Sequence, residues 1–224
     1  MPDPSARAAK TGQNTGRTAS KEVRRQQLID ATIESIAQNG MSGTTMTSVT
    51  GFAGLSIGIV NFHFKNKETL FEETLRYLAE EHRNQWRQSV KKADLAPEAK
   101  LLAIVDAHFH PRICSRKKLA VWFGFYGEAA TRASYRHIMS EIDDERWYIS
   151  QQIIGEIIEA GGHKGLTARE VADTLEGLYD GFWLNILIYP EEFSRDDAMA
   201  RIRDYLADTF PNHFDHPAPR LCED

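Results

Sequence analysis

Three hydrogen-bonding side chains lie among apolar neighbours between positions 56 and 63, where the sequence reads SIGIVNFH. They are Ser56, Asn61 and His63. Side chains of these types read the donor and acceptor pattern of base edges when one helix presents them together in a DNA groove. Their types and spacing therefore indicate contact with nucleic acid, provided that the surrounding chain forms elements that hold such a helix in place.

The residues around this stretch predict two short helices joined by a turn. Thr47 is expected to cap a first helix that runs to about Ala53, because its hydroxyl can accept a hydrogen bond from a first-turn amide. Gly54 takes a left-handed conformation at little cost and ends that helix. Ser56 is expected to cap a second helix over residues 57–63. This arrangement is a helix-turn-helix, whose second helix enters the major groove.

The apolar residues of this segment agree with that arrangement. One face of the first helix carries Val49, Phe52 and Ala53. Ile59 or Val60, together with Phe64, can close over that face. The alternative is a helical hairpin that only packs in a core and touches no DNA, and the local pattern leaves it open.

A second set of residues with possible chemistry is aromatic. Trp122, Tyr126, Trp147 and Trp183 lie on three expected helices. If they converge, they can enclose a quaternary ammonium through cation–π attraction of about 0.5–2 kcal/mol per ring. The alternative is that these rings only pack in the core and in a dimer interface.

Other reactive groups form no convincing site. Asp106, His108, His110 and Cys114 might suggest a metal, but His-x-His lacks the i, i+4 spacing of helical zinc sites. The acidic run 143–145 fits a solvated helix face. The sequence contains no nucleophile elbow, phosphate loop or dinucleotide fingerprint. We therefore predict no catalytic residue, no metal site and no cofactor.

The charge of the chain is unevenly distributed. The 224 residues carry a formal net charge of −5 at pH 7. Residues 1–92 contain 13 Lys and Arg against 9 Asp and Glu, a net charge of +4, whereas residues 93–224 carry −9. A basic front and an acidic rear fit a protein that presents one end to phosphates.

Composition limits the remaining classes. Hydrophobic residues make up 42% of the chain, as in ordinary globular proteins. No apolar run is long enough to span a membrane, and the N-terminus lacks the apolar core of a secretory signal. Cys114 and Cys222 lie in different contexts and are not expected to form a disulfide. A reducing cytoplasm is the simplest location.

Apolar periodicity predicts an all-α chain. Asn66, Thr167 and Ser194 are expected to cap three of its helices. The last two long helices are too apolar for a monomer surface, so we expect them to pair with their twofold copies in a homodimer. In addition to the two short helices, the expected helices cover residues 21–39, 67–92, 97–110, 119–130, 137–160, 168–189 and 195–210.

These elements divide the chain into four parts. Residues 1–20 are expected to form a disordered basic arm, and residues 21–66 a three-helix DNA-binding domain. Residues 67–210 form a helical effector-binding and dimerisation domain, and residues 211–224 a flexible tail.

The run AGLSIGIVNFHFKNKETLFEE resembles the TetR family of bacterial repressors. This family has an alanine-glycine turn, a Ser-x-Gly at the start of the recognition helix, an aromatic-rich end and a Phe-x-x-Lys-Glu-x-Leu segment. Asn61 departs from the tyrosine that is frequent in the family, and Gly51 weakens the first helix by roughly 1 kcal/mol relative to alanine. The matching residues are Ala53, Gly54, Ser56, Gly58, Phe62, His63, Phe64, Lys67, Glu68 and Leu70.

Helix position within this pattern assigns the expected DNA contacts. Side chains at the exposed face of the second helix are expected near bases, and those at the helix starts near phosphates, which position a protein without reading sequence. The residues expected near bases are Ser56, Ile57, Asn61 and Phe62. The residues expected near the backbone or supporting the contact are Arg24, Arg25, Thr45, Thr47, Gly58, His63 and Lys67.

Three further segments resemble the BetI branch of that family, whose members respond to choline. They are RRQQLIDAT at residues 24–32, the segment 122–126 and the segment 179–184. The resemblance implies a choline-like effector in the box of Trp122, Tyr126, Trp147 and Trp183, with Asp180 or Glu128 facing the cation.

Together these patterns favour a ligand-responsive repressor that binds double-stranded operator DNA as a homodimer. A small-molecule effector, choline or a related quaternary amine, is expected to release it from a palindromic operator. The alternative is a helical ligand-binding or scaffold protein whose helix-turn-helix has lost operator recognition.

Overall fold

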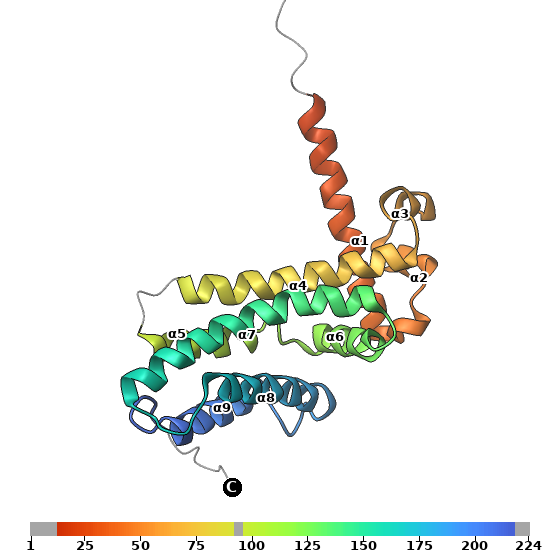
Figure 1. Ribbon diagram of the computed structural model, residues 1–224. Coiled ribbons are helices and arrows are strands. Elements are labelled where there is room, and N and C mark those ends of the chain that lie inside the picture. Colours follow the sequence, from red (N-terminus) through yellow and green to blue (C-terminus); the bar gives the residue numbers. More distant parts are fainter. Residues whose placement is uncertain (1–12, 92–95, 218–224) are drawn as a thin grey trace, which may run out of the picture. The chain divides into compact units, whose positions relative to one another are not determined.

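The computed structural model describes residues 13–91 and 96–217, with side chains from residue 21 onward. Its ordered elements in these ranges are all helices, which confirms the all-α prediction (Figure 1). They are α1 (Gln13–Gly43), α2 (Met46–Ala53), α3 (Ile57–His63), α4 (Lys67–Lys91), α5 (Pro97–His108), α6 (Arg116–Ala129), α7 (Ala133–Gly161), α8 (Ala168–Ile188) and α9 (Arg195–Thr209).

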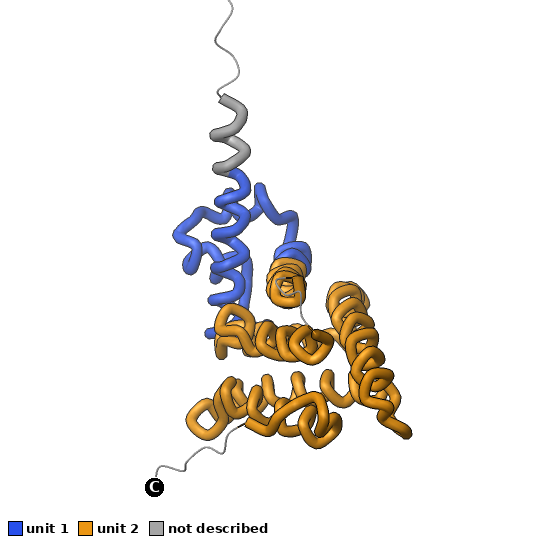
Figure 2. The backbone as a smooth tube through the Cα atoms, turned by 90° about the vertical axis from the view of Figure 1, so that its left-hand side faces the viewer, with its two compact units in different colours: residues 1–74 blue, residues 75–224 orange. Residues whose placement is uncertain are grey.

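The helices form two compact units, residues 1–74 and residues 75–224, which are coloured separately in Figure 2. The boundary falls inside α4, so this single helix belongs to both units. In the first unit, the apolar faces of α1, α2 and α3 meet in a small core. Leu28, Val49, Val60, Phe64 and Leu70 are fully buried there.

The cap of α2 differs from the prediction. Thr45, not Thr47, is the N-cap: its side chain accepts a hydrogen bond from the Ser48 amide, and the Ser48 hydroxyl accepts one from the Thr45 amide. This reciprocal pairing makes use of both side chains, which a cap at Thr47 does not offer. Gly54 ends α2 with φ 62, as predicted. Ser56 precedes α3, but its side chain makes no cap hydrogen bond.

The first helix is longer than expected. Of the predicted disordered arm, residues 1–12 lie outside the described residues, while α1 begins at Gln13. At its other end α1 is interrupted at Gly40, whose φ of 71 and ψ of 174 are not helical, and a short second helical stretch continues to Gly43. A glycine accepts this positive φ at little cost, so the regular helix breaks at the position where the sequence predicted its end.

The second unit is a helical domain whose core is built from α4 to α9. Leu101, Ile104, Phe125, Ile154 and Leu206 are fully buried. Pro97 occupies the first turn of α5, where its missing amide proton is not needed. The central helix α6 starts at Arg116, earlier than expected, because the Ser115 hydroxyl accepts from the Lys118 amide and caps it there.

The caps of the last two helices follow the prediction with one change. Ser194 and Asp197 form a reciprocal capping box at the start of α9. At α8, Thr167 accepts from the Glu170 amide, but the Glu170 carboxylate accepts from the Thr167 hydroxyl at 2.6 Å. Beyond α9, Phe214 is buried, so this part of the predicted flexible tail is packed. Residues 218–224 lie outside the described ranges.

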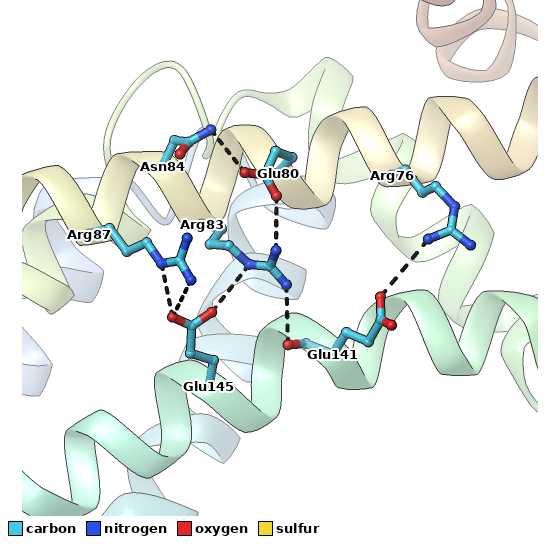
Figure 3. A network of polar contacts seen from close by, with 7 residues as sticks. All are labelled: Arg76, Glu80, Arg83, Asn84, Arg87, Glu141 and Glu145. Atoms are coloured by element: carbon cyan, nitrogen blue, oxygen red, sulfur yellow. Dashed lines mark hydrogen bonds and ion pairs between the residues drawn. The ribbon is translucent and has the colours of Figure 1, made fainter.

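Charged side chains join α4 to α7 within the second unit (Figure 3). The Glu145 carboxylate accepts two hydrogen bonds from Arg87, at 2.8 and 2.6 Å, and lies 3.3 Å from Arg83. Arg83 also donates to the Glu141 carbonyl at 3.3 Å. This network fixes the lateral position of α4 against α7 on their outer surfaces. Within the described ranges, no helix has the length and apolar content needed to cross a lipid bilayer.

Candidate functional site

The short helix α3 packs one side against the core of the first unit and exposes the other side to solvent. Val60 and Phe64 anchor it in the core with no exposed area. The residues predicted near bases all lie on its open side. Ser56, Ile57, Gly58, Asn61 and Phe62 are exposed.

The exposed face of α3 is partly apolar. Phe62 is 74% exposed and Ile57 is 46% exposed, which is unusual for large hydrophobic side chains on a short helix. Phe52 on α2 is also 40% exposed, although the sequence pattern placed it on the packing face. Thr45 and Thr47 are exposed at the start of α2. The surface therefore combines polar groups with apolar side chains of the kind that contact thymine methyl groups.

Two of the basic residues expected at phosphates are engaged inside the unit. Arg25 forms an ion pair with Glu73, and its guanidinium lies 4.9 Å from the centroid of the Phe64 ring. Lys67 donates to the Met41 carbonyl at 3.1 Å. These two side chains therefore join α1 to α4 within the first unit.

Other polar groups of the unit remain at its surface. Arg24 is exposed and hydrogen-bonds only its neighbour Gln27, at 2.7 Å, in the contacts that are described. Lys65 is exposed and was missed by the sequence analysis, although it stands two residues before Lys67. Partial burial, with smaller effects of Lys21 and Arg25, lowers the pKa of His63, so this imidazole is neutral at pH 7.

The second unit gathers three of the four rings predicted to form an aromatic box. The Trp122 ring centroid lies 6.1 Å from that of Tyr126 and 6.2 Å from that of Trp183. Trp122 and Trp183 are buried in the core. We call Trp122, Tyr126 and Trp183 the aromatic site.

Trp147 is not part of the aromatic site. Its indole nitrogen donates to Asp173 at 2.7 Å, and the Arg169 guanidinium lies 6.0 Å from its ring centroid. The correction has a simple geometric reason. Trp147 follows the buried Arg146, and an α-helix turns by about 100° between successive residues, so the two side chains face different neighbours.

Three residues that the sequence analysis did not assign to the effector site, His82, His108 and Tyr179, lie beside Trp183 or beside one another. The His108 ring stacks against Tyr179 at 4.3 Å and against Trp183 at 4.2 Å, and the His82 ring lies 4.9 Å from that of His108. Each of these four side chains is at most 3% exposed. We call His82, His108, Tyr179 and Trp183 the inner cluster; Trp183 belongs to both groups.

The inner cluster carries polar atoms that no described group satisfies. These buried atoms are His82 Nε2, both ring nitrogens of His108, the Tyr179 hydroxyl and Trp183 Nε1. Leaving a buried polar group without a partner costs about 1–3 kcal/mol, and native proteins contain few of them. Burial, with a smaller effect of Arg146, lowers the pKa of His82; burial, His82 and Arg146 lower that of His108. Both rings are therefore neutral at pH 7.

Carboxylates outnumber cations beside the aromatic site. Arg146 is 4% exposed and pairs with both Glu176 and Asp143. Desolvation and the negative charge of Asp143 raise the pKa of Asp180 to about 6. Partial burial also raises the pKa of Asp143, against the attraction of Arg146. Three carboxyl groups thus lie near the single guanidinium of Arg146, and their ionisation leaves a net negative charge.

Glu128, the other carboxylate proposed to face a cation, is occupied elsewhere. It pairs with Arg132 at 2.6 Å, one turn away along the chain. Asp106 and Cys114, which were considered as metal ligands, also have other surroundings. Asp106 pairs with Arg203 at 2.9 Å, while burial raises the pKa of the Cys114 thiol to about 12.

Both units match families of known proteins. Residues 28–74 match the family described as "Bacterial regulatory proteins, tetR family", and residues 97–211 match "BetI-type transcriptional repressor, C-terminal". The chain belongs to the TetR family. Its BetI-type C-terminal domain and its helix-turn-helix make it a DNA-binding transcriptional regulator and not an enzyme. Regulators of the TetR family bind operator DNA and small-molecule effectors and are dimeric.

Individual relatives agree with this assignment. The HTH-type transcriptional regulator BetI of Paraburkholderia phymatum is 32% identical over 191 residues, which cover 83% of this chain and 92% of that protein. A second BetI protein, from Burkholderia thailandensis, is 33% identical over 189 residues, with 83% and 93% covered.

Among solved structures, the fold recurs at low sequence identity. A protein of Saccharomonospora viridis, assigned as a transcriptional regulator and solved in complex with choline, has a TM-score of 0.74 at 18% identity, with 83% of this chain and 96% of that chain covered. FadR of Bacillus subtilis, solved with stearoyl-CoA, has a TM-score of 0.67 at 21% identity, with 83% and 97% covered.

Proposed function

We propose that this TetR-family regulator is a cytoplasmic repressor whose effector is a small quaternary amine such as choline. It binds a palindromic operator as a homodimer, and the effector releases it. The observation that carries the choice of effector is the aromatic site together with the excess of carboxylates beside it. The two neighbours solved with choline and with stearoyl-CoA share the fold, so the side chains of the site must select the ligand.

The aromatic site suits an ammonium group for two reasons. Ring faces attract a cation by about 0.5–2 kcal/mol each, more when water is excluded, and Trp122 and Trp183 are buried. Asp143, Glu176 and Asp180 leave an uncompensated negative charge next to Tyr126. An opposite charge favours the ionised form of carboxyl groups, so a bound cation also relieves their mutual repulsion.

For DNA, we propose that α3 lies in the major groove and that Ser56, Ile57, Asn61 and Phe62 contact bases. The apolar Ile57 and Phe62 favour thymine methyl groups, while Asn61 favours adenine. Phosphates are assigned to Arg24, Thr45, Thr47, His63 and the exposed Lys65. Arg25 and Lys67 must first leave Glu73 and the Met41 carbonyl to join them.

We assign the dimer interface to α8 and α9. Gly177, Gly181, Leu184 and Ile188 recur on one face of α8 at four- and three-residue spacing, and all four are exposed in the protomer. A side-chain carbon added at either glycine meets no atom within 4 Å. Small and apolar residues along one open helix face let a twofold copy approach closely. To bind half-sites one helical turn apart, such a dimer has to hold its two recognition helices about 34–36 Å apart.

Release follows from linkage between the two sites. A ligand shifts a population only as far as its affinities for two forms differ. The effector therefore has to bind more tightly to a form whose two α3 helices do not match the operator spacing. α4 belongs to both units and is the covalent route between them.

Two measurements test this function. A gel-shift assay against the DNA upstream of the protein's own gene should give a specific complex, and a scrambled fragment of equal length is the control. A thermal-shift screen of quaternary amines should raise the melting temperature of the protein with at least one of them. If no specific complex forms, operator binding is refuted. If no amine raises the melting temperature, the effector class is refuted.

A further inference from the structure

The proposed effector site leaves the inner cluster unused. An ammonium group needs ring faces and negative charge, and it forms no hydrogen bonds when its nitrogen is fully alkylated. The polar atoms of His82, His108, Tyr179 and Trp183 require a different kind of partner. They are buried, they belong to three helices, and no described protein group satisfies them.

The chemistry of these atoms defines the partner. An indole nitrogen only donates, so Trp183 Nε1 needs an acceptor. A neutral imidazole offers one donor and one acceptor, and the Tyr179 hydroxyl offers both. An oxygen atom that accepts hydrogen bonds, and that can also donate one, satisfies such a mixture. A bare hydrocarbon or a bare tetraalkylammonium ion does not.

The position of Trp183 links the inner cluster to the aromatic site. Its ring lies 6.2 Å from that of Trp122 and 4.2 Å from that of His108. One indole therefore borders both groups, with a ring face for a cation and an Nε1 proton for an oxygen. A ligand that uses both needs only a short spacer between its charge and its oxygen.

We propose that the inner cluster is a second subsite of the effector site and hydrogen-bonds an oxygen of the ligand. This proposal rests on the proposed function. It assigns the effector to small ammonium compounds that carry a hydroxyl or carbonyl oxygen close to the charged nitrogen. His82 lies on α4, so the oxygen end of the ligand contacts the helix shared by both units.

The proposal is tested by isothermal titration calorimetry of the full chain with three probes. Choline carries both the charge and the hydroxyl, tetramethylammonium carries only the charge, and 3,3-dimethyl-1-butanol is the uncharged carbon analogue of choline. Three variants are compared with the natural sequence. His108→Phe keeps a flat ring between Tyr179 and Trp183 but removes both nitrogens, Tyr179→Phe removes a single hydroxyl, and Trp147→Phe is a control outside the cluster.

We expect choline to bind about tenfold or more tightly than tetramethylammonium, because a site built for an oxygen rejects an analogue that lacks it. His108→Phe and Tyr179→Phe should reduce that ratio and leave the affinity for tetramethylammonium unchanged, while Trp147→Phe keeps the ratio. Equal binding of choline and tetramethylammonium, or a ratio that neither inner variant changes, overturns the subsite and leaves the cation site standing.

The uncharged probe separates failure of the subsite from failure of the proposed effector class. If neither cation binds, but the alcohol binds and Tyr179→Phe or His108→Phe weakens it, the quaternary-amine proposal is wrong and the oxygen subsite is supported. If none of the three probes binds, both proposals are overturned.

Discussion

The guanidinium of Arg146 and the carboxylate of Glu176 form a two-point ion pair that joins α7 to α8. Arg146 Nε donates to Glu176 Oε1 at 3.2 Å, and Nη2 pairs with the second oxygen. Arg146 is 4% exposed, and Glu176 is 25% exposed. The pair therefore fixes a buried charge at the point where the aromatic site, the inner cluster and the acidic side chains meet.

Glu176→Gln should destabilise the protein, because it leaves the buried guanidinium with Asp143 as its one remaining carboxylate partner among the described contacts. We expect the free energy of unfolding to fall by about 2–3 kcal/mol, near the lower end for breaking a buried ion pair. Urea unfolding measures the change. Glu128→Gln, which breaks the exposed pair with Arg132, is the matched control and should change stability by less than about 1 kcal/mol. Similar losses in both variants contradict this account of Arg146.

The stability of the protein should depend on pH through His82 and His108. Both have pKa values lowered by burial, with Arg146 on α7 and Tyr179 on α8 nearby. In the unfolded chain, a histidine binds its proton near pH 6.5, so below that pH the unfolded state holds more protons than the folded state. The contribution of these residues is complete above about pH 6.5 and is lost as the pH falls toward their folded pKa values.

The expected slope is at most about 1.4 kcal/mol per pH unit for each histidine. Asp180 acts in the opposite sense between its unfolded pKa and about 6, because its carboxyl binds a proton more readily in the folded state. Comparison of the natural sequence with His108→Phe by urea unfolding between pH 5 and 7.5 isolates one histidine. The variant should show a flatter dependence on pH, and an unchanged slope would show that His108 does not titrate on unfolding.

The DNA-binding helices followed from local chemistry, whereas the inner cluster did not. The signals that locate α2 and α3 lie within a few residues of one another, so both helices could be predicted from the sequence. These signals are Gly54, Ser56 and the apolar positions Val49 and Val60. The cap of α2 was misplaced by two residues because Thr45 and Thr47 are both good caps, and only the reciprocal bond with Ser48 distinguishes them.

Contacts between distant helices could not be read from the sequence. His82, His108 and Trp183 come from α4, α5 and α8, and no local spacing brings them together. Trp147 is the opposite case. The sequence pattern placed it in the aromatic box, but its indole nitrogen donates to Asp173 instead. The one available signal for the inner cluster was His108 itself, a polar residue in an apolar helix, which the sequence analysis considered only as a metal ligand.

Trp122 and Trp147 provide a direct test of the aromatic site, because only Trp122 belongs to it. Trp122→Leu should weaken choline binding by about threefold to thirtyfold, the range of one lost cation–π contact. Trp147→Leu should leave choline affinity unchanged. Calorimetric titration of both variants, after circular dichroism has shown that they fold, measures the difference. A larger loss in Trp147→Leu would place the ligand elsewhere.

Gly181→Leu should convert the dimer into monomers. The glycine lies on the open face of α8, and an added side chain meets no atom of its own protomer within 4 Å. The substitution should therefore preserve the fold and block the approach of the partner. Sedimentation velocity at micromolar concentration measures the change. Gly127→Leu, on α6 and equally open in the protomer, is the control, and a Gly181→Leu variant that remains dimeric would exclude this helix face as the interface.

Asn61 and Lys65 should affect DNA binding in different ways. Asn61→Ala should change which operator sequences are preferred, because a base contact discriminates by about 1–3 kcal/mol. Lys65→Ala should weaken binding to all sequences and reduce the slope of affinity against salt concentration by about one. Binding to a library of operator variants at several salt concentrations separates the two effects. Identical profiles for both variants would contradict the orientation assigned to α3.

One small ammonium compound and the operator should exclude each other from this protein. This exclusion is tested most directly by titrating choline into a preformed complex of the protein with its fluorescent upstream fragment and following the anisotropy. The anisotropy should fall saturably to the value of free DNA, and tetramethylammonium should be less effective than choline at equal concentration. A complex that keeps its anisotropy while calorimetry shows choline bound to the same protein would contradict it.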